Sequence, residues 1–319
     1  MPRCRLLLLA LAVVMGGLLP AACSPGERGA DAGASDPDRL VFLFQRQRDP
    51  ASTAATAREA AAFLSERLGI EVVPVVPGDY AASVQALVSR QADVAYVSAL
   101  PFLLARRDAE ARLLVAEVRP DAMGDQRTDY DSVWVVREDS ALRTIEDVAA
   151  RGSDLRVAFT SRTSTSGFVM ATLSLTRAGV LRPRQSPTEV FRGVAFAGGY
   201  TQALHEVLSG RADLCAVSFY TVEGPTADVY TTQAERDQLR VLARTPGVPT
   251  HLVCVRGGIS EELGARITSA LLALSAERPD LLRNVYGAIE FREVDEDAHV
   301  RSAVDAMEAV GLPVDGFVQ

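Results

Sequence analysis

The sequence predicts an α/β fold of two lobes, and three observations support this prediction. Segments typical of strands and helices alternate along the chain, as they do in folds built on parallel strands. A unit of 21 residues that begins at Gly78 recurs without a gap at Gly198, with seven identities. About 280 residues follow the N-terminal segment, which suits two cores better than one. We therefore expect two lobes, each a mixed, mostly parallel sheet flanked by helices, with a central cleft.

The N-terminal residues predict export. Two arginines precede an apolar run over 6–19, which is too short to span a membrane and is typical of a secretory signal. Small residues precede Cys23, as at a bacterial lipoprotein processing site, although Pro20 stands where such sites usually carry leucine. We expect a lipoprotein signal peptide over 1–22, lipidation of Cys23 and a flexible tether over 23–39. A plain signal peptide that is cut nearby is the alternative.

The next segments predict the first lobe. An apolar strand is followed by a helix that ends at Gly69, and the next strand contains Pro74, which favours a sheet edge. The first copy of the repeat then supplies a helix and a short strand. In order, the expected elements are a strand over 39–44, a helix over 51–69, a strand over 71–76, a helix over 80–89 and a strand over 92–98.

After a strand over 130–139 the alternation restarts. The expected elements are a helix over 144–150, a strand over 155–161 and a helix over 166–180. The segment 190–199 then leads into the second copy of the repeat, which is followed by two strands around a Pro246–Gly247 turn and a mostly helical tail from 260 onward. The long strand at 130 and the strands around Pro246 are the expected crossings between lobes. Lobe 1 then comprises 40–133 and 256–319, and lobe 2 comprises 134–255.

The repeat places the same residues at the same points of each lobe. Tyr80 and Tyr200 begin a helix, and Ser98 and Ser218 end the strand that follows it. Ligands bind at the carboxyl ends of strands in open α/β sheets, so two facing copies would line a cleft symmetrically. Asp93 and Asp213 precede these strands, where we expect them to cap turns. The alternative is that any two such units of α/β proteins look somewhat alike.

The stretch "STSGF", which begins at Ser164, is the most informative motif. It follows a predicted strand and opens a predicted helix, whose first turn offers unpaired backbone N–H groups at the positive end of the helix dipole. Ser164, Thr165 and Ser166 add hydroxyl donors, and Gly167 would let an anion approach the backbone closely. This combination suits a small oxyanion. The alternative is that the cluster only caps the helix.

Composition excludes several other kinds of site. The net charge of −8 and the lack of a basic tract argue against nucleic acid. The chain contains no lysine, which excludes a Walker-type phosphate lysine and a pyridoxal site. Cys215 and Cys254 could form a disulfide, pack as small apolar residues or join a ligand site. We expect His205 and His299 on the surface and His251 near the cleft, and we expect no metal and no cofactor.

These segments resemble the phosphate-, phosphite- and phosphonate-binding components of ABC importers, a branch of the type II periplasmic binding proteins. The resemblance covers the chain after the tether. It rests on both copies of the repeat, on "YDSVWVVREDSALRTIEDV" and on "STSGF" after a strand. It implies the type II fold, in which this Ser/Thr loop holds the oxygens on phosphorus and an aromatic residue lines the cleft. Tyr80, Ser164, Thr165 and Ser166 are therefore the first expected ligand contacts.

The sequence departs from this family at two places. Members that bind aminoalkylphosphonates usually carry histidine where Tyr200 stands, and they hold the amine of the ligand with acids. Glu223 resembles one of these acids, whereas His251 stands where the second is expected. The identity of the oxyanion is therefore left open. The complete expected ligand-binding set is Tyr80, Ser98, Ser164, Thr165, Ser166, Tyr200, Ser218, Glu223 and His251.

The resemblance implies an exported, membrane-anchored lipoprotein that delivers a small phosphorus oxyanion to an ABC transporter permease. We expect a monomer without enzymatic activity, because no Ser–His or Cys–His arrangement stands at a recognisable site. The alternatives are an oxyanion receptor for a signalling partner and an enzyme recruited from the same fold.

Overall fold

A computed structural model describes residues 36–45 and 50–316, and residues 35–319 form one compact unit. The expected signal peptide and Cys23 lie outside the described residues, as does most of the expected tether. Folded contacts begin before residue 40, where the sequence placed the start of lobe 1. Asp36 accepts a hydrogen bond from the Ser260 amide at 2.9 Å, and the first strand starts at Arg39. No helix in the described ranges is long and apolar enough to cross a membrane.

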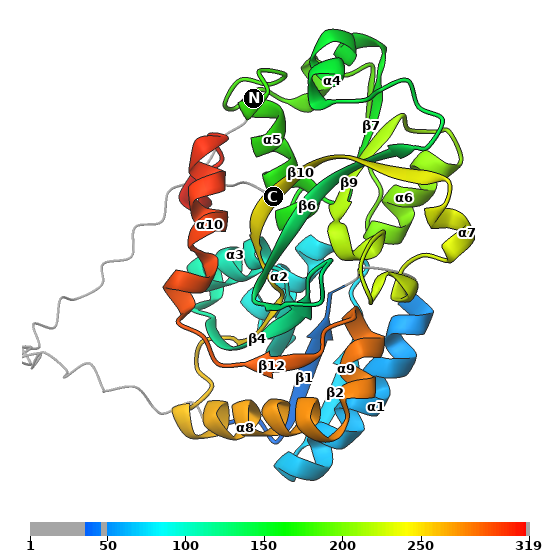
Figure 1. The fold of residues 1–319 in the computed structure, drawn as a ribbon. Helices are drawn as coiled ribbons and strands as arrows, with labels where there is room; N and C mark the ends of the chain where they lie inside the picture. The colour runs from blue at the N-terminus through cyan, green and yellow to red at the C-terminus, as the bar shows by residue number, and fades with distance from the viewer. Residues whose placement is uncertain (1–35, 46–49, 317–319) are drawn as a thin grey trace, which may run out of the picture. The chain divides into compact units, whose positions relative to one another are not determined.

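Two mixed sheets form the framework (Figure 1). The first sheet has the order β12-β4-β11-β3-β1-β2, with β5 paired to β4, and the second has the order β10-β6-β9-β7-β8. The strands are β1 (Arg39–Phe44), β2 (Glu71–Val75), β3 (Val94–Val97), β4 (Arg112–Pro120), β5 (Gln126–Arg127), β6 (Asp129–Arg137), β7 (Arg156–Phe159), β8 (Gly193–Phe196), β9 (Leu214–Ser218), β10 (Leu239–Pro249), β11 (Leu252–Val255) and β12 (Glu290–Arg292).

The helices follow the expected alternation, and a π-helical turn that we call η2 (Thr165–Met170) precedes α5. The helices are α1 (Pro50–Leu68), α2 (Tyr80–Val88), α3 (Ala99–Ala109), α4 (Ile145–Arg151), α5 (Ala171–Arg177), α6 (Tyr200–Leu208), α7 (Gln233–Arg236), α8 (Glu261–Glu277), α9 (Pro279–Tyr286) and α10 (Glu296–Ala309).

The sheets are mixed, as expected, but they are not mostly parallel. Four of the ten strand pairings within the described ranges are parallel, β1 with β2 and β3, and β7 with β8 and β9. Each of the remaining pairings is antiparallel and includes β4, β6, β10 or β11. These are the strands through which the chain passes from one sheet to the other without an intervening helix. Crossing strands of this kind need no helical connection, so the helix–strand alternation does not reveal their direction.

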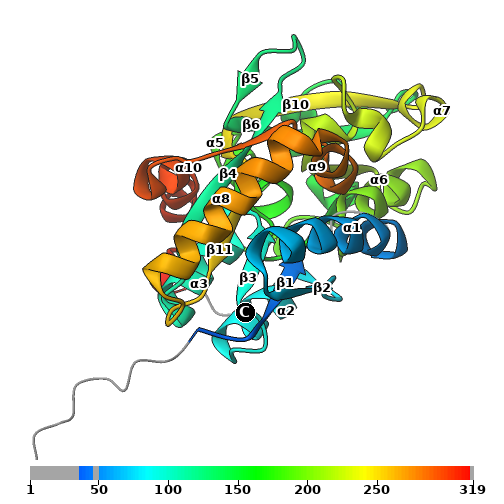
Figure 2. The ribbon, with the colours of Figure 1, turned by 90° about the horizontal axis from the view of Figure 1, so that it is seen from below.

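Both faces of the first sheet are buried, which its alternating side chains explain. Leu40, Phe42 and Phe44 of β1 pack with α1, α8 and α9, and Figure 2 shows these three helices across that face. Leu43 points to the opposite face and packs with α2 and α3. The core on this second face continues into β6, β7, β9, α5 and α6, so one hydrophobic cluster joins the two sheets.

The repeat corresponds to duplicated structure. Helices α2 and α6 each have nine residues and begin at a fully buried tyrosine. Asp93 and Asp213 were expected to cap turns, but each links neighbouring strands. The Asp93 carboxylate accepts from the Val41 amide at 2.9 Å, and that of Asp213 accepts from the Arg156 amide at 2.7 Å. Each also pairs with an arginine, so the shared carboxylate fixes the strand order in both copies.

The expected turn at Pro246–Gly247 is wrong. β10 runs through these residues, and a register shift between Thr245 and Val248 accommodates them, with Gly247 at a φ of 84°. The break between strands comes at Thr250 and His251 instead. There the Thr250 hydroxyl donates to the Glu117 carbonyl at 2.6 Å, which holds this connection against β4.

Helix α10 contacts elements of both sheets (Figure 1). At its start, Glu296 accepts from the Leu113 amide at 2.8 Å and from Arg106 at 3.0 Å. At its end, the Val310 carbonyl accepts from the Arg184 amide at 2.8 Å. The helical tail therefore adds a third connection alongside the two pairs of crossing strands.

Candidate functional site

The "STSG" motif opens a helix, as expected. Ser164 is the N-cap, and its hydroxyl accepts from the Gly167 amide at 3.0 Å. The π-helical turn η2 begins at Thr165 and continues directly into α5. Ser164, Thr165 and Ser166 are all completely buried. The Gly167 amide is paired with this N-cap, whereas the amides of Thr165 and Ser166 lie in the first turn, at the positive end of the helix dipole, which is a suitable place for an anion.

Gly167 serves a different purpose from the one expected. A Cβ atom there would lie 2.1 Å from Thr160 Oγ1 and 3.0 Å from Ser164 Oγ. The missing side chain therefore lets the helix start approach the end of β7, and not an anion approach the backbone.

We predict that Gly167→Ala destabilises the protein by about 1–3 kcal/mol through this overpacking. Gly78→Ala is the control, because Gly78 also lies near the start of a helix, α2, but a Cβ there meets nothing within 4 Å. Urea denaturation followed by circular dichroism measures both changes. Equal free energies of unfolding for the two variants would contradict the close approach.

Three hydroxyl groups meet at this helix start. Ser166 Oγ lies 2.9 Å from the Tyr200 hydroxyl and 2.9 Å from Ser218 Oγ. Ser132 on β6 fixes the same turn by donating to the Ser166 carbonyl at 2.8 Å. The strand end at Ser218 and the helix start at Tyr200 thus converge with the motif, as the repeat predicts.

The first sheet contributes a matching edge. The Leu100 amide at the start of α3 donates to Thr165 Oγ1 at 2.8 Å, which connects the two halves of the chain directly at the motif. Ser98 lies at the end of β3, where its amide donates to Gln45 Oε1 at 3.1 Å. Gln45, at the end of β1, is fully buried and was not expected from the sequence. Its buried side-chain amide adds a polar group to the site beside Ser98.

All seven tyrosines of the chain are buried and form one cluster, which we call the tyrosine cluster. Ring contacts link most of its members, with centroids 5.1 Å apart for Tyr130 and Tyr220, and 6.1 Å for Tyr200 and Tyr220. Tyr80 interacts electrostatically with Tyr200 and Tyr130, which places it in the same group. The seven residues are Tyr80, Tyr96, Tyr130, Tyr200, Tyr220, Tyr230 and Tyr286.

Several polar atoms of this cluster lack partners. Within the described ranges, the hydroxyls of Tyr80, Tyr130 and Tyr220 and the Nε2 atom of His251 are buried without a hydrogen bond. The Tyr130 hydroxyl nevertheless lies beside the hydroxyls of Ser166, Ser218 and Tyr200. Burial raises the pKa of Tyr80, Tyr130 and Tyr220 well above the ordinary value of 10.0, so these hydroxyls stay protonated. Buried unpaired polar groups are rare in native proteins, so their occurrence in one cluster makes it the candidate binding site.

A buried ion pair supports one side of the cluster. Glu117 and Arg119 on β4 pair with each other, and both side chains are at most 1 % exposed. Arg119 also donates to the Tyr286 carbonyl and lies 3.7 Å from the centroid of the Tyr220 ring. His251 Nδ1 lies 3.3 Å from Glu117 Oε1, and its ring stacks on Tyr130. His251 therefore lies next to the cluster, whereas Glu117 and Arg119 were not recognised from the sequence.

Acid should weaken this buried network. Burial alone would raise the pKa of Glu117, but Arg119 and His251 outweigh it and lower the pKa from 4.5 to about 2. Burial, assisted by Arg119 and opposed by Glu117, lowers the pKa of His251 below 6.5. Both groups bind protons more readily in the unfolded chain, so both favour folding at higher pH.

We predict that the free energy of unfolding falls as the pH drops below 6.5, and falls further between 4.5 and 2. Urea titrations at a series of pH values measure this dependence. His251→Gln should flatten the upper part of the curve. It should also reduce the fall between pH 4.5 and 2, because His251 helps to lower the pKa of Glu117; other carboxyls of lowered pKa, such as Asp213, contribute to the remainder of that fall. A stability independent of pH over this whole range would contradict the assigned charge states.

Some residues named from the sequence lie elsewhere. Glu223 pairs with Arg244, and its side chain is 34 % exposed. His205 is exposed beside Glu235, as expected. His299 is not a free surface residue, because it is half-buried with Nε2 3.1 Å from the Thr250 carbonyl. Cys215 and Cys254 are free and fully buried in different sheets, and burial raises the pKa of each thiol. They pack as small apolar residues, and no group of metal-binding side chains occurs in the described ranges.

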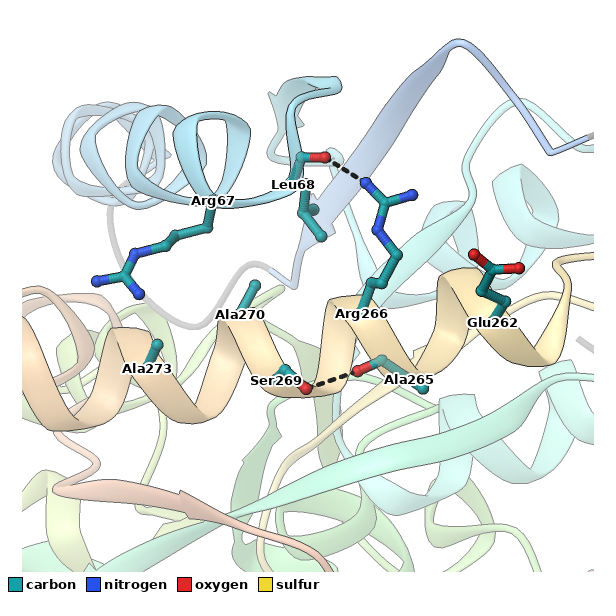
Figure 3. A pocket seen from close by; sticks show the side chains of 8 residues that line it. All are labelled: Arg67, Leu68, Glu262, Ala265, Arg266, Ser269, Ala270 and Ala273. Carbon is teal, nitrogen blue, oxygen red and sulfur yellow. Dashed lines mark hydrogen bonds between the residues drawn. The ribbon is translucent and has the colours of Figure 1, made fainter.

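Two hollows differ in their relation to this site. One of about 320 Å³ is lined by Asp79, Ala81 and residues 160–163, so it lies beside the start of η2. Another, of about 450 Å³, lies between the end of α1 and α8 (Figure 3). Its arginines are engaged, Arg67 with Glu277 and Arg266 with the Leu68 carbonyl. None of the site residues expected from the sequence lines this second hollow, and we assign it no ligand.

The chain is similar to known binding proteins over most of its length. Structures of comparable fold include a binding-protein component of an ABC phosphonate transporter from Pseudomonas aeruginosa (TM-score 0.72, 18 % identity, covering 85 % of this chain and 88 % of that one). Others are PhnD1 from Prochlorococcus marinus in complex with methylphosphonate (0.70, 17 %, 86 % and 100 %) and XAC2383 from Xanthomonas citri bound to chloride (0.68, 20 %, 86 % and 99 %).

These similarities establish the fold, and they confirm the expected class of two mixed α/β sheets of the type II periplasmic binding proteins. The model of one family, described as "ABC transporter, phosphonate, periplasmic substrate-binding protein", matches residues 42–299. That match spans both sheets and the whole tyrosine cluster. The chain therefore belongs to the family of periplasmic substrate-binding proteins of phosphonate ABC transporters.

Proposed function

We propose that this protein captures a small phosphorus oxyanion, a phosphonate, phosphite or phosphate, outside the cytoplasm and delivers it to an ABC permease as a monomer. Membership of the family carries the periplasmic solute-binding role. The single observation that supports an oxyanion is the meeting of Ser166, Tyr200 and Ser218 at the start of a buried helix, among hydroxyls that have no partner. Such a group of neutral donors can bind an anion without a lysine or a metal.

Binding would redirect hydrogen bonds that the hydroxyls now exchange. Ser166 would donate to an oxygen on phosphorus, as would Tyr200 and the first amides of η2, because the positive end of the helix dipole lies there. Tyr80 and Tyr130 offer two more buried hydroxyls. A hydrogen bond to a charged group contributes about 1.5–3 kcal/mol, so a few of them suffice for micromolar binding.

We propose that the two sheets, each with its helices, move as two lobes around the crossing strands. The division follows the expected 40–133 with 256–319 and 134–255, except that β6 belongs to the second sheet from Asp129 onward and β11 belongs to the first sheet up to Val255. The hydrogen bond from the Leu100 amide to Thr165 Oγ1 supports this idea, since it joins the two parts beside the site. It would form on closure and break on opening, and the permease would recognise the closed form.

The lipid anchor is a separate part of the proposal, and it rests on the sequence around Cys23. Expression of the full chain with a labelled fatty acid tests it. We expect label in the wild-type protein and none in Cys23→Ala. Export of an unlabelled wild-type protein would instead favour the plain signal peptide.

Calorimetric titration of the purified protein, freed of ligand by denaturation and refolding, tests the oxyanion. Phosphate, phosphite, methylphosphonate, sulfate and arsenite form the panel, and we expect submicromolar binding of one phosphorus oxyanion. No heat from any member would refute the proposal. Among rival functions, a signalling receptor would co-purify with a sensor in place of a permease. An enzyme would need a base beside a nucleophile, whereas the partners of Ser166 are Tyr200 and Ser218.

A further inference from the structure

One buried carboxylate lies beside the tyrosine cluster. In the described part of the chain, Asp93 and Glu117 are the buried acids. Asp93 precedes β3 and pairs with Arg256, so it lies at the end of that strand opposite Ser98. Glu117, by contrast, faces Tyr96, His251 and Arg119 directly. A cationic group of a ligand that enters the cluster would therefore need Glu117 as its counter-ion.

Both carboxylate oxygens of Glu117 already accept hydrogen bonds within the protein. Its Oε1 accepts from Arg119 Nε and lies 3.3 Å from both the backbone nitrogen and Nδ1 of His251. Its Oε2 accepts from the Tyr96 hydroxyl. The positive charge of Arg119 already balances this carboxylate, because the two side chains form an ion pair. A second cation would therefore find no unbalanced negative charge there.

Acids further out are also engaged. Glu223 and Asp131 both pair with Arg244, and their side chains are 34 % and 36 % exposed. Asp79 accepts from the Ala82 amide as the N-cap of α2. An ammonium group could reach one of these carboxylates only at the surface, where water competes with it.

The unpaired atoms beside the tyrosine cluster are neutral or lie next to a positive charge. The Tyr130 and Tyr220 hydroxyls and His251 Nε2 have no partner in the described ranges. Tyr220 lies directly against the guanidinium of Arg119, which imposes a positive potential on this side. Hydroxyl groups can serve an oxygen or a small apolar substituent, whereas a buried ammonium without a counter-ion is strongly disfavoured.

We infer that the site selects an oxyanion that bears no ammonium group and excludes its amine-bearing analogue. The inference rests on the proposed function, with the oxygens at Ser166 and Tyr200 and the substituent toward Tyr220. The loss of hydration by an unpaired ammonium should weaken binding by about 100-fold or more.

Ethylphosphonate and 2-aminoethylphosphonate test this inference, because they differ by the ammonium group alone. Both are titrated calorimetrically into the purified wild-type protein, together with phosphate and methylphosphonate. We expect the tightest ligand to be amine-free and 2-aminoethylphosphonate to bind at least about 100-fold more weakly. An amine-bearing ligand as tight as the amine-free ones would overturn the inference and leave the proposed function standing. If no oxyanion binds, the proposed function itself fails.

A pair of variants tests the position of Tyr220. Tyr220→Glu adds a carboxylate that Arg119, already paired with Glu117, cannot neutralise as well, so it should narrow the ratio between the affinities for ethylphosphonate and 2-aminoethylphosphonate by at least about tenfold. Tyr220→Gln is the neutral control, because glutamine has the same length as glutamate. It should leave the ratio of the two affinities unchanged. A folded Tyr220→Glu protein with an unchanged preference would overturn the placement of the substituent beside Tyr220.

Discussion

Glu117→Gln is expected to destabilise the protein by about 3–5 kcal/mol, because it leaves a buried guanidinium without its counter-ion. Arg119 is fully buried, and its Nε donates to Glu117. Glutamine keeps one acceptor but presents its NH₂ group to donors, since Tyr96 and His251 also use the carboxylate. The free energy of unfolding in urea, followed by circular dichroism at neutral pH, measures the loss.

The neighbouring strand offers a matched control for this change. Glu290 and Arg292 on β12 have the same spacing and pair at 2.6 Å, but their side chains are 38 % and 47 % exposed. Glu290→Gln should therefore cost less than about 1 kcal/mol. Replacing the buried pair together, as Glu117→Leu with Arg119→Met, should recover much of the lost stability, because no charge is then left unpaired. Equal losses for Glu117→Gln and Glu290→Gln would contradict a dominant role of burial.

The parts of the fold that could be predicted from sequence depend on local signals. The repeat identified both tyrosines that begin α2 and α6, and the serines that end β3 and β9, because a duplicated unit keeps its residues in register. The helix start after β7 was recognisable from its hydroxyl side chains. Strand direction was not, since a strand that crosses directly to the other sheet has the same apolar pattern as one that follows a helix.

The rest of the site could not be predicted because it forms between distant segments. Glu117 and Arg119 alternate with apolar residues on β4, a pattern that normally indicates a solvent-exposed face. Here Tyr286 of α9, 167 residues later than Arg119, covers that face. The tyrosines are similarly scattered, and only their shared burial reveals the cluster. One signal could have helped, because both Tyr80 and Tyr200 occur in the repeat and tyrosine is otherwise rare in this chain.

The sequence interpretation of Gly167 shows the same limit at a single residue. At a helix start, a glycine that follows hydroxyl residues leaves room for a close contact with its backbone. Either a ligand or another part of the protein can make that contact. The contact with Thr160 distinguishes them. Because β7 ends at this point, the glycine sets the distance between strand and helix, and through it the position of Ser166.

Ser166→Ala is expected to weaken binding of the preferred oxyanion by about 10- to 150-fold, which corresponds to one lost hydrogen bond to a charged group. Its hydroxyl is the one that touches both Tyr200 and Ser218, so the substitution also leaves those two donors without their shared partner. Thr165→Ala should act differently from Ser166→Ala. Thr165 Oγ1 accepts from the Leu100 amide, so this substitution removes a hydrogen bond that favours the arrangement in which the two parts of the chain meet.

The two variants can be separated by measuring affinity and stability together, with Ser161→Ala as the control from the same loop. Ser161 is half-buried and its hydroxyl serves Thr163, so we expect unchanged affinity. Ser166→Ala should lower the thermal midpoint without ligand only by the cost of unpairing the Tyr200 and Ser218 hydroxyls, and it should lose most of the stabilisation that ligand adds. If its midpoint without ligand fell sharply and its affinity were normal, the hydroxyl would serve the helix start alone. The motif would then be a cap, and the oxyanion would have to be held by the tyrosines.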